Sequence, residues 1–173
     1  MDRLTGFGRR EGCRDGGLLA VHAVKVTDIM SVDYDAAARC YRGMVLREGA
    51  AVAGYRFDEG TAWYRQTAEG VPPLSKVSHE VEFDIAGVDG SSLRAVGELV
   101  AVSETGIVLL VETAAGERLL VGWSPVFGGE RPLRTYRCVA DTFPAYDSDP
   151  RIGVAFRSED TEFSYPFAGE FPF

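Results

Sequence analysis

Hydrophobic and polar residues alternate along much of this chain, most clearly in the segment 76–85, KVSHEVEFDI. Successive side chains of a β-strand point to opposite faces, so this period of two predicts a half-buried strand. The face expected to be buried carries Val77, His79, Val81, Phe83 and Ile85. The opposite face, expected to meet solvent, carries Ser78, Glu80, Glu82 and Asp84.

Several other segments show β patterns. Strands are expected at 18–26, 41–47, 133–140 and 152–157. The runs 52–57 and 61–67 flank the turn-forming sequence Asp-Glu-Gly, which predicts that they pair with each other as a hairpin. Segment 107–123 predicts the clearest hairpin, because Gly116 suits the positive-φ position of a short turn. Its arms are apolar on both faces, which indicates central strands covered on two sides.

One segment, 92–103, has the spacing of a helix. Leu93, Val96 and Val100 recur at three- and four-residue intervals, and Gly106 follows as a stop signal. Ser91 or Ser92 is the expected N-cap. A strand at 98–102 is the alternative interpretation.

These patterns predict a mainly β fold, a β-sandwich or barrel of about eight to ten antiparallel strands with one α-helix near 92–103. We expect residues 1–173 to form a single β-rich domain, since the chain has the length of one domain and shows no internal repeat. The expected flexible parts are an N-terminal arm at 1–16 and a C-terminal tail at 168–173.

The net charge of −8 argues against a protein that holds nucleic acid by neutralising phosphates, so no sequence-specific nucleic-acid binding is expected. No apolar run reaches membrane-spanning length, and a soluble cytoplasmic protein without a membrane partner is the expectation. The three cysteines are widely spaced and are expected to be free thiols. The only local cluster of basic residues lies in the arm and comprises Arg3, Arg9, Arg10 and Arg14. These arginines are expected either to be solvated or to contact nucleic acid or an acidic partner surface.

His79 lies beside three carboxylates in the sequence, which raises the hypothesis of an acid/base site. Strand geometry opposes it, because His79 points to the face opposite Glu80, Glu82 and Asp84. We therefore interpret His79 as a hydrogen-bonded core or rim residue. The carboxylates lie about 6.5 to 7 Å apart along one face, too far for a shared metal ion without other ligands. A solvated face paired with Arg65 or Arg56 is the favoured interpretation, and no catalytic residue, metal site or cofactor is expected.

Residues 68–76 interrupt the strand pattern. Pro72 and Pro73 cannot continue regular pairing, so a projecting loop is expected here. The residues that we regard as a candidate contact with a neighbouring subunit are Gly70, Val71, Pro72, Pro73 and Leu74.

The order of these features resembles a group of poorly characterised prophage proteins encoded among phage structural genes. The resemblance rests on CRDGGLLAVHAV, YRFDEGTAWYRQ, KVSHEVEFDI, GIVLLVETAAGERLLVGW and VAFRSEDTEFSYPF. A β domain with a projecting loop, and a helix before a strong hairpin, is similar to the tail-tube fold of phages. The resemblance implies subunits that assemble into rings, usually hexameric, with other phage structural proteins as partners.

From this resemblance we expect a non-enzymatic structural protein, a component of the virion or of the host cytoplasm before assembly. Glu80, Glu82 and Asp84 are then a candidate assembly or lumen face, where negative charge repels DNA. The arm and the aromatic C-terminus would become ordered on assembly. The alternative is a β-barrel binding module for a small apolar ligand enclosed by Trp63, Phe83 and Trp123. An enzyme built on His79 or a cysteine is the third hypothesis.

Overall fold

A computed structural model describes residues 16–57, 60–70, 76–142 and 149–170. The described strands are β1 (Leu18–Lys25), β2 (Ile29–Asp35), β3 (Cys40–Leu46), β4 (Val52–Arg56), β5 (Ala62–Glu69), β6 (Lys76–Ala86), β7 (Ile107–Thr113), β8 (Arg118–Val121), β9 (Arg134–Asp141) and β10 (Arg151–Asp160). One α-helix, α1 (Gly90–Thr105), lies between β6 and β7, and a 3-10 turn (Val26–Asp28) joins β1 to β2. The expected mainly β fold with one helix is confirmed.

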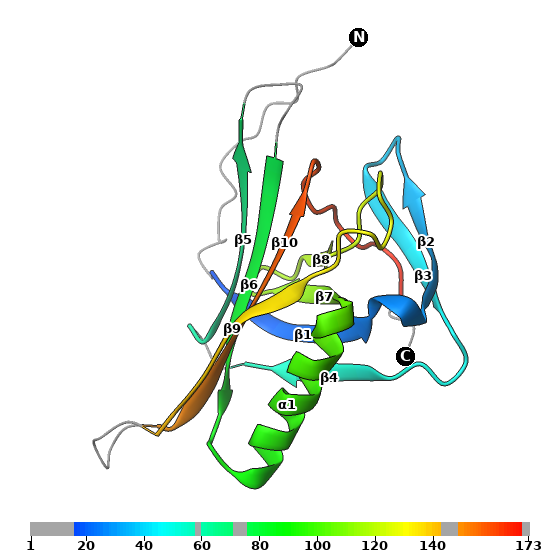
Figure 1. Ribbon diagram of the computed structural model, residues 1–173. Helices are drawn as coiled ribbons and strands as arrows, with labels where there is room; N and C mark the ends of the chain where they lie inside the picture. Colours follow the sequence, from blue (N-terminus) through cyan, green and yellow to red (C-terminus); the bar gives the residue numbers. More distant parts are fainter. Residues whose placement is uncertain (1–15, 58–59, 71–75, 143–148, 171–173) are drawn as a thin grey trace.

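Two four-stranded antiparallel sheets form the body of the fold (Figure 1). Their strand orders are β4-β1-β7-β8 and β5-β6-β10-β9, and a third sheet consists of the hairpin β2-β3. The two larger sheets face each other across one core, and α1 contacts β1, β9 and β10. This is the layered arrangement of a sandwich, in which each sheet buries one face against the other.

Phe83 of β6 is at the centre of the core between the sheets. Its ring contacts Phe156 on the neighbouring β10, and it contacts Tyr55 and Phe57 from the opposite sheet. The side chains of Val81 and Phe83 have no exposed surface, whereas the alternate residues of β6 are only half-buried. The burial pattern predicted for 76–85 is therefore confirmed.

A second core covers the other face of the sheet β4-β1-β7-β8. The β2-β3 hairpin and the segment 165–167 pack there against Leu110 of β7 and Leu120 of β8. Tyr41 of β3 and Phe167 are almost fully buried in this core. Five consecutive residues of β7, Ile107–Val111, are buried, which confirms the prediction of a strand covered on both sides.

The predicted pairing of 52–57 with 61–67 is wrong. β4 pairs with β1 in one sheet, and β5 pairs with β6 in the other, so the segment between β4 and β5 crosses from sheet to sheet. The aromatic residues explain the difference, because Tyr55 and Phe57 meet Phe83 across the core rather than across a hairpin. The burial of Tyr55 and Phe57 against Phe83 outweighs the local turn signal.

The helix is longer than predicted and differs in its cap. It runs from Gly90 to Thr105, which excludes the strand alternative at 98–102. Asp89, and not Ser91 or Ser92, is the N-cap, and its carboxylate accepts hydrogen bonds from both serine N–H groups. The most buried positions of α1 are Val96, Leu99 and Ser103, while Leu93 is half-exposed. Gly106 ends the helix as expected, with φ of 105°.

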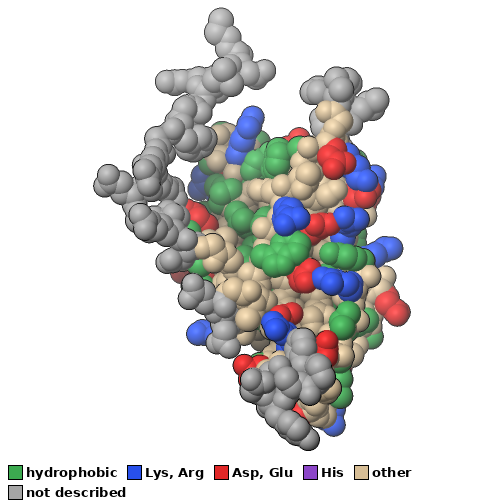
Figure 2. Space-filling model, turned by 90° about the vertical axis from the view of Figure 1, so that its left-hand side faces the viewer, with side chains coloured by type: hydrophobic (Ala, Val, Ile, Leu, Met, Phe, Trp, Pro, Cys, Tyr) green, Lys and Arg blue, Asp and Glu red, His purple; other side chains and the backbone are tan. Residues whose placement is uncertain are grey.

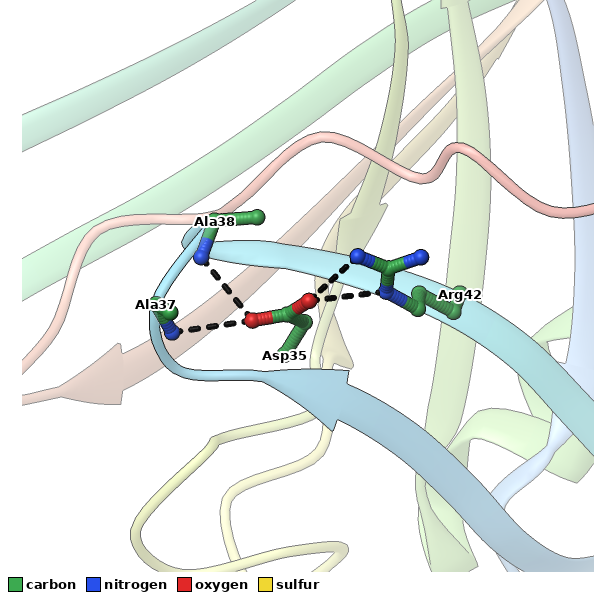
Figure 3. A network of polar contacts seen from close by, with 4 residues as sticks. All are labelled: Asp35, Ala37, Ala38 and Arg42. Atoms are coloured by element: carbon green, nitrogen blue, oxygen red, sulfur yellow. Dashed lines mark hydrogen bonds and ion pairs between the residues drawn. The ribbon is translucent and has the colours of Figure 1, made fainter.

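The sequence analysis did not identify β2, although polar and apolar residues alternate over 31–35. Its hairpin with β3 is fixed by a polar network at the turn (Figure 3). The Asp35 carboxylate accepts hydrogen bonds from the N–H groups of Ala37 and Ala38 and pairs with the Arg42 guanidinium. Such aspartate turns satisfy backbone donors locally and let Arg39 adopt a positive φ of 50°.

The C-terminal segment packs against the body of the fold. Phe167 N–H donates to the Arg118 carbonyl, and Ala168 N–H donates to the Tyr41 carbonyl. Any flexible tail within 168–173 therefore begins after Ala168, and residues 171–173 lie outside the described part. Tyr165 and Phe167 already pack within the single chain, which corrects the expectation that assembly orders them. Of the predicted arm, only Gly16 is described.

Phe83→Asp should abolish the cooperative unfolding transition at neutral pH. The variant buries an unpaired charge between the sheets, a change that costs more than about 4 kcal/mol. Glu82→Gln, one residue away on the opposite face, is the matched control and should melt close to the wild type. Circular dichroism melts of both variants test which face of β6 is buried. If only the glutamine variant unfolds, the buried and outer faces have been assigned the wrong way round.

Asp89→Ala should destabilise the protein at pH 7 because it removes the helix cap. Hydrogen bonds from Ser91 and Ser92 lower the pKa of Asp89 from its ordinary 3.8 to about 2. The charged cap therefore stabilises the fold above pH 3.8, and this stabilisation is lost as the pH falls toward 2. The difference in melting temperature between variant and wild type should shrink over that range. A difference that grows on acidification would contradict the role of the charge.

Candidate functional site

The outer face of the sheet β5-β6-β10-β9 carries the candidate site, and Figure 2 shows acidic and basic side chains interspersed with hydrophobic ones on the side of the molecule turned to the viewer. We call this surface the ladder face. It is defined by three ion pairs, Glu80–Arg157, Glu82–Arg137 and Asp84–Arg151. The structure therefore brings the three predicted carboxylates together on one exposed side of β6, opposite the core.

Each carboxylate of β6 pairs with its own arginine, two of which lie on β10 and one on β9. Glu80 lies directly opposite Arg157 of β10, which donates to it from two guanidinium nitrogens. Arg151 Nη1 lies 2.9 Å from Asp84 Oδ2, on the diagonal between the same two strands. The ion-pair partners are thus Arg137, Arg151 and Arg157. Arg65 lies opposite Glu80 in the register of β5 and β6, as expected, but its guanidinium stacks on Trp63, and Arg56 belongs to the other sheet.

The pair Glu82–Arg137 spans two strands, and small residues on β10 make room for it. Ala155 separates the two in register, with Glu82 on one side and Arg137 on the other. The next outward position along β10 is Gly153, where an added Cβ would lie 3.1 Å from the Asp84 carboxylate. The outward positions of β10 are thus Arg151, Gly153, Ala155 and Arg157. The two small residues in the middle let side chains of β6 and β9 meet above β10.

The ion pairs remove the surplus negative charge that the sequence suggests for this face. The hydrogen bonds that the guanidinium groups of Arg137 and Arg157 donate to Glu82 and Glu80 raise the pKa of both arginines above their usual range, so both remain charged. Six side chains of opposite sign balance one another. Because these pairs are neutral overall, Glu80, Glu82 and Asp84 do not give the face the negative charge that would repel a polyanion.

Aromatic and apolar groups border the ladder face. On the edge strand β5, the Arg65 guanidinium stacks 4.9 Å from the Trp63 ring centroid. On the other edge strand, β9, Arg157 from β10 lies 5.4 Å from the Tyr136 ring, and Val139 is half-exposed. Both edges of the sheet thus present apolar surface to solvent.

His79 is on the core side of β6, within a satisfied hydrogen-bond network. Its Nε2 lies 3.0 Å from the Glu162 carbonyl oxygen, which can only accept, so Nε2 carries the proton. Nδ1 then accepts a hydrogen bond from the Tyr64 hydroxyl at 2.9 Å. His79 is only 3% exposed. Its interpretation as a hydrogen-bonded core residue is confirmed.

The same network attaches the C-terminal segment to the sheet. Tyr64 also contacts the Ser164 hydroxyl at 2.8 Å, and Ser164 N–H donates to Gln66 Oε1 at 3.0 Å. Burial raises the pKa of the Tyr64 hydroxyl and lowers that of the His79 imidazole. The chemistry of this cluster is therefore that of a neutral structural junction.

The predicted loop 68–76 is shorter than expected. Ala68 pairs with Val77, and Glu69 pairs with Lys76, so β5 and β6 form a long hairpin whose connection is 70–75. Gly70 begins this connection with φ of 107°. The other candidate contact residues, Val71, Pro72, Pro73 and Leu74, lie outside the described residues.

The three aromatic residues proposed to enclose a ligand do not share an interior. Trp63 faces outward beside Arg65, Phe83 is in the core between the sheets, and Trp123 packs in the second core. The structure instead has a groove of about 450 Å³ between α1 and β4. None of the three aromatic residues lines it.

Within the described residues, no group of three or more His, Cys, Asp or Glu side chains is arranged to hold a metal ion. The helix in this part of the chain is not long and apolar enough to cross a membrane. No family model, curated protein or solved structure matches the chain.

The arginines of the ladder face were missed in the sequence, although a signal for them exists. Segment 151–157, RIGVAFR, alternates in the same way as 76–85 and places Arg151 and Arg157 on its polar face. Only the pairing of β10 with β6 and β9 brings these groups beside the carboxylates. Arg137 carries no such local signal.

His79→Gln should reduce the dependence of stability on pH just below neutrality. Since burial lowers the pKa of His79 from 6.5, the unfolded chain takes up more protons than the folded chain below pH 6.5. The free energy of unfolding of the wild type should therefore fall between about pH 7 and pH 5. Denaturant titrations should give a flatter profile for His79→Gln. The control variant His22→Gln retains His79 and should keep its contribution to the pH dependence. If the free energy of unfolding of His79→Gln changes with pH as steeply as that of the wild type, the lowered pKa of His79 is contradicted.

Proposed function

We propose that this protein is a non-enzymatic structural subunit of phage tail-tube type that assembles into rings by joining the edges of the sheet β5-β6-β10-β9. The observation that carries the proposal is that this sheet ends in two long strands without a partner among the described residues, β5 and β9. The resemblance of the sequence to phage structural proteins supports the same interpretation.

The two edge strands offer extensive unpaired backbone. Each has eight residues, and most residues of β9 are exposed. Long open edges promote pairing with another chain, and proteins that stay monomeric usually cover them. The other large sheet shows such cover, because the segment 165–167 lies along β8: Leu120 N–H donates to the Tyr165 carbonyl, and Phe167 N–H donates to the Arg118 carbonyl.

The direction of the strands is compatible with closure into a ring. All neighbours in the order β5-β6-β10-β9 are antiparallel, so β5 and β9 run in opposite directions. Under rotational symmetry with the axis along the strands, β9 of one copy lies antiparallel to β5 of the next. Such a head-to-tail contact repeats around the axis and leaves no free edge.

The distribution of bulk determines which face lines the ring. The other large sheet, α1 and the β2-β3 hairpin all lie on the core side of the sheet β5-β6-β10-β9 (Figure 1). Since the inner circumference of a ring is the smaller one, the bulky layers lie outside and the ladder face lines the lumen. A lumen of paired charges would hold DNA phosphates weakly, because each arginine is already bound to a carboxylate.

The double variant Tyr136→Lys, Val139→Lys should shift the protein from assemblies to single chains, because added charge on an edge strand opposes pairing. Multi-angle light scattering over a concentration series and negative-stain imaging measure the change. The matched control Met30→Lys, Val45→Lys alters two exposed apolar residues of the β2-β3 hairpin and should leave assembly intact. A wild-type protein that remains monomeric at the highest concentrations, or a control that disrupts assembly equally, would count against the proposal.

A further inference from the structure

The groove between α1 and β4 combines an apolar lining with an open strand edge. Its volume is about 450 Å³. Its apolar lining includes Val52, Tyr55, Ala95, Leu99, Val102 and Ile107. β4 is the edge strand of its sheet, so one long side of the groove is backbone that no described strand covers.

The hydrogen-bond pattern shows which backbone groups of β4 face the open edge. Phe57 N–H donates to the Leu19 carbonyl, so Phe57 bonds to β1. Bonded and non-bonded pairs alternate in an antiparallel ladder, which assigns Tyr55 and Ala53 to the same side as Phe57. The N–H and C=O groups of Val52, Gly54 and Arg56 therefore point away from β1.

Such an edge fits a peptide better than a small apolar molecule. An added strand would satisfy the outward N–H and C=O groups, while its side chains enter the pocket beside Leu99 and Val102. A hydrocarbon ligand would fill the pocket and leave the backbone groups unsatisfied. The charged residues of the lining are Asp28 and Glu98 against Lys25, which favours a segment with basic side chains.

We propose that this groove binds residues 1–15 of a second copy of the chain in extended conformation, as an additional strand on β4. That segment has the required chemistry. It contains four of the 18 basic residues of the chain but only three of its 26 acidic residues, Asp2, Glu11 and Asp15. Its large apolar residues are Met1, Leu4 and Phe7, which supply side chains for the pocket.

The length of the segment is sufficient for a contact between copies. An extended chain spans at most about 3.3–3.6 Å per residue, so the segment reaches about 50 Å from Gly16. The groove itself requires only a short stretch, because three residues of β4 offer outward backbone groups. This contact rests on the proposed function only because it requires that copies of the chain associate. It uses the edge of β4, which is separate from the edges of β5 and β9.

A photo-crosslinking experiment on the full chain tests this contact. Benzoylphenylalanine replaces Phe7 in an unlabelled chain, which is mixed with a ¹⁵N-labelled chain and irradiated. Mass spectrometry should find the unlabelled segment joined to labelled peptides that contain β4 or α1. Cross-links confined to one chain, or to surfaces away from the groove, would overturn the proposal.

Two substitutions in the labelled chain make the test specific. Val52→Pro removes one outward N–H and should lower the cross-link yield about fivefold, as expected for one lost hydrogen bond. Val52→Thr keeps the N–H and should retain the yield. Val102→Lys places a positive charge in the apolar pocket, where it opposes a basic segment, and should also lower the yield; it is the second test, should the proline variant not fold. Unchanged yields in folded Val52→Pro and Val102→Lys overturn the proposal, as does a small molecule that native mass spectrometry finds bound to the wild type but not to Val102→Lys.

The same samples separate this contact from ring formation. If the Tyr136→Lys, Val139→Lys variant loses rings but keeps the cross-link, the groove contact stands by itself. If wild-type rings form without the cross-link, the groove proposal fails and the ring proposal remains.

Discussion

The contact between the two four-stranded sheets, centred on Phe83, is the constraint on which the other features of this protein depend. Phe83 contacts a neighbour on its own sheet and two aromatic rings from the opposite sheet. This burial fixes the register of β6, because a slip of one residue would bring Glu82 into the core. The direction of every carboxylate on the ladder face follows from it.

The same contact also explains why the fold leaves particular edges open. β4 and β5 are consecutive in the chain, but the aromatic residues draw them into different sheets. Each of these strands therefore becomes an edge, and β9 is the third open edge of the two four-stranded sheets among the described residues. The C-terminal segment covers the outer edge of β8 and also bonds to Tyr41 of β3. Of the four edges of the two larger sheets, the described residues cover one and leave three open, and the proposed assembly would use such open edges.

Local patterns predicted much of the fold. The alternation in 76–85 identified both faces of β6, and the apolar arms of 107–123 identified a strand covered on both sides. Long-range effects account for the errors. The turn signal at 58–60 did not reveal that Tyr55 and Phe57 pack against Phe83. The alternation in β2 covers only 31–35, and the strand also depends on its hairpin with β3 and on the second core. The helix begins earlier than predicted because the Asp89 carboxylate accepts hydrogen bonds from the Ser91 and Ser92 N–H groups and so caps it.

The candidate site was only half predictable for the same reason. Glu80, Glu82 and Asp84 follow from the period of one strand, whereas their arginine partners come from β9 and β10 and require the pairing of strands far apart in sequence. A stripe that looks acidic in the sequence is a charge-balanced surface in the fold. In the proposed ring, this difference would replace repulsion of DNA by weak binding.

Hydrogen–deuterium exchange of the backbone amides over a concentration series is the most direct measurement of the central claim. If copies join through the edges β5 and β9, protection of amides in both strands should rise together with concentration, while β6 and β10 remain unchanged because they are already paired. Exchange in β5 and β9 that is independent of concentration, in a sample that contains assemblies, would contradict the account.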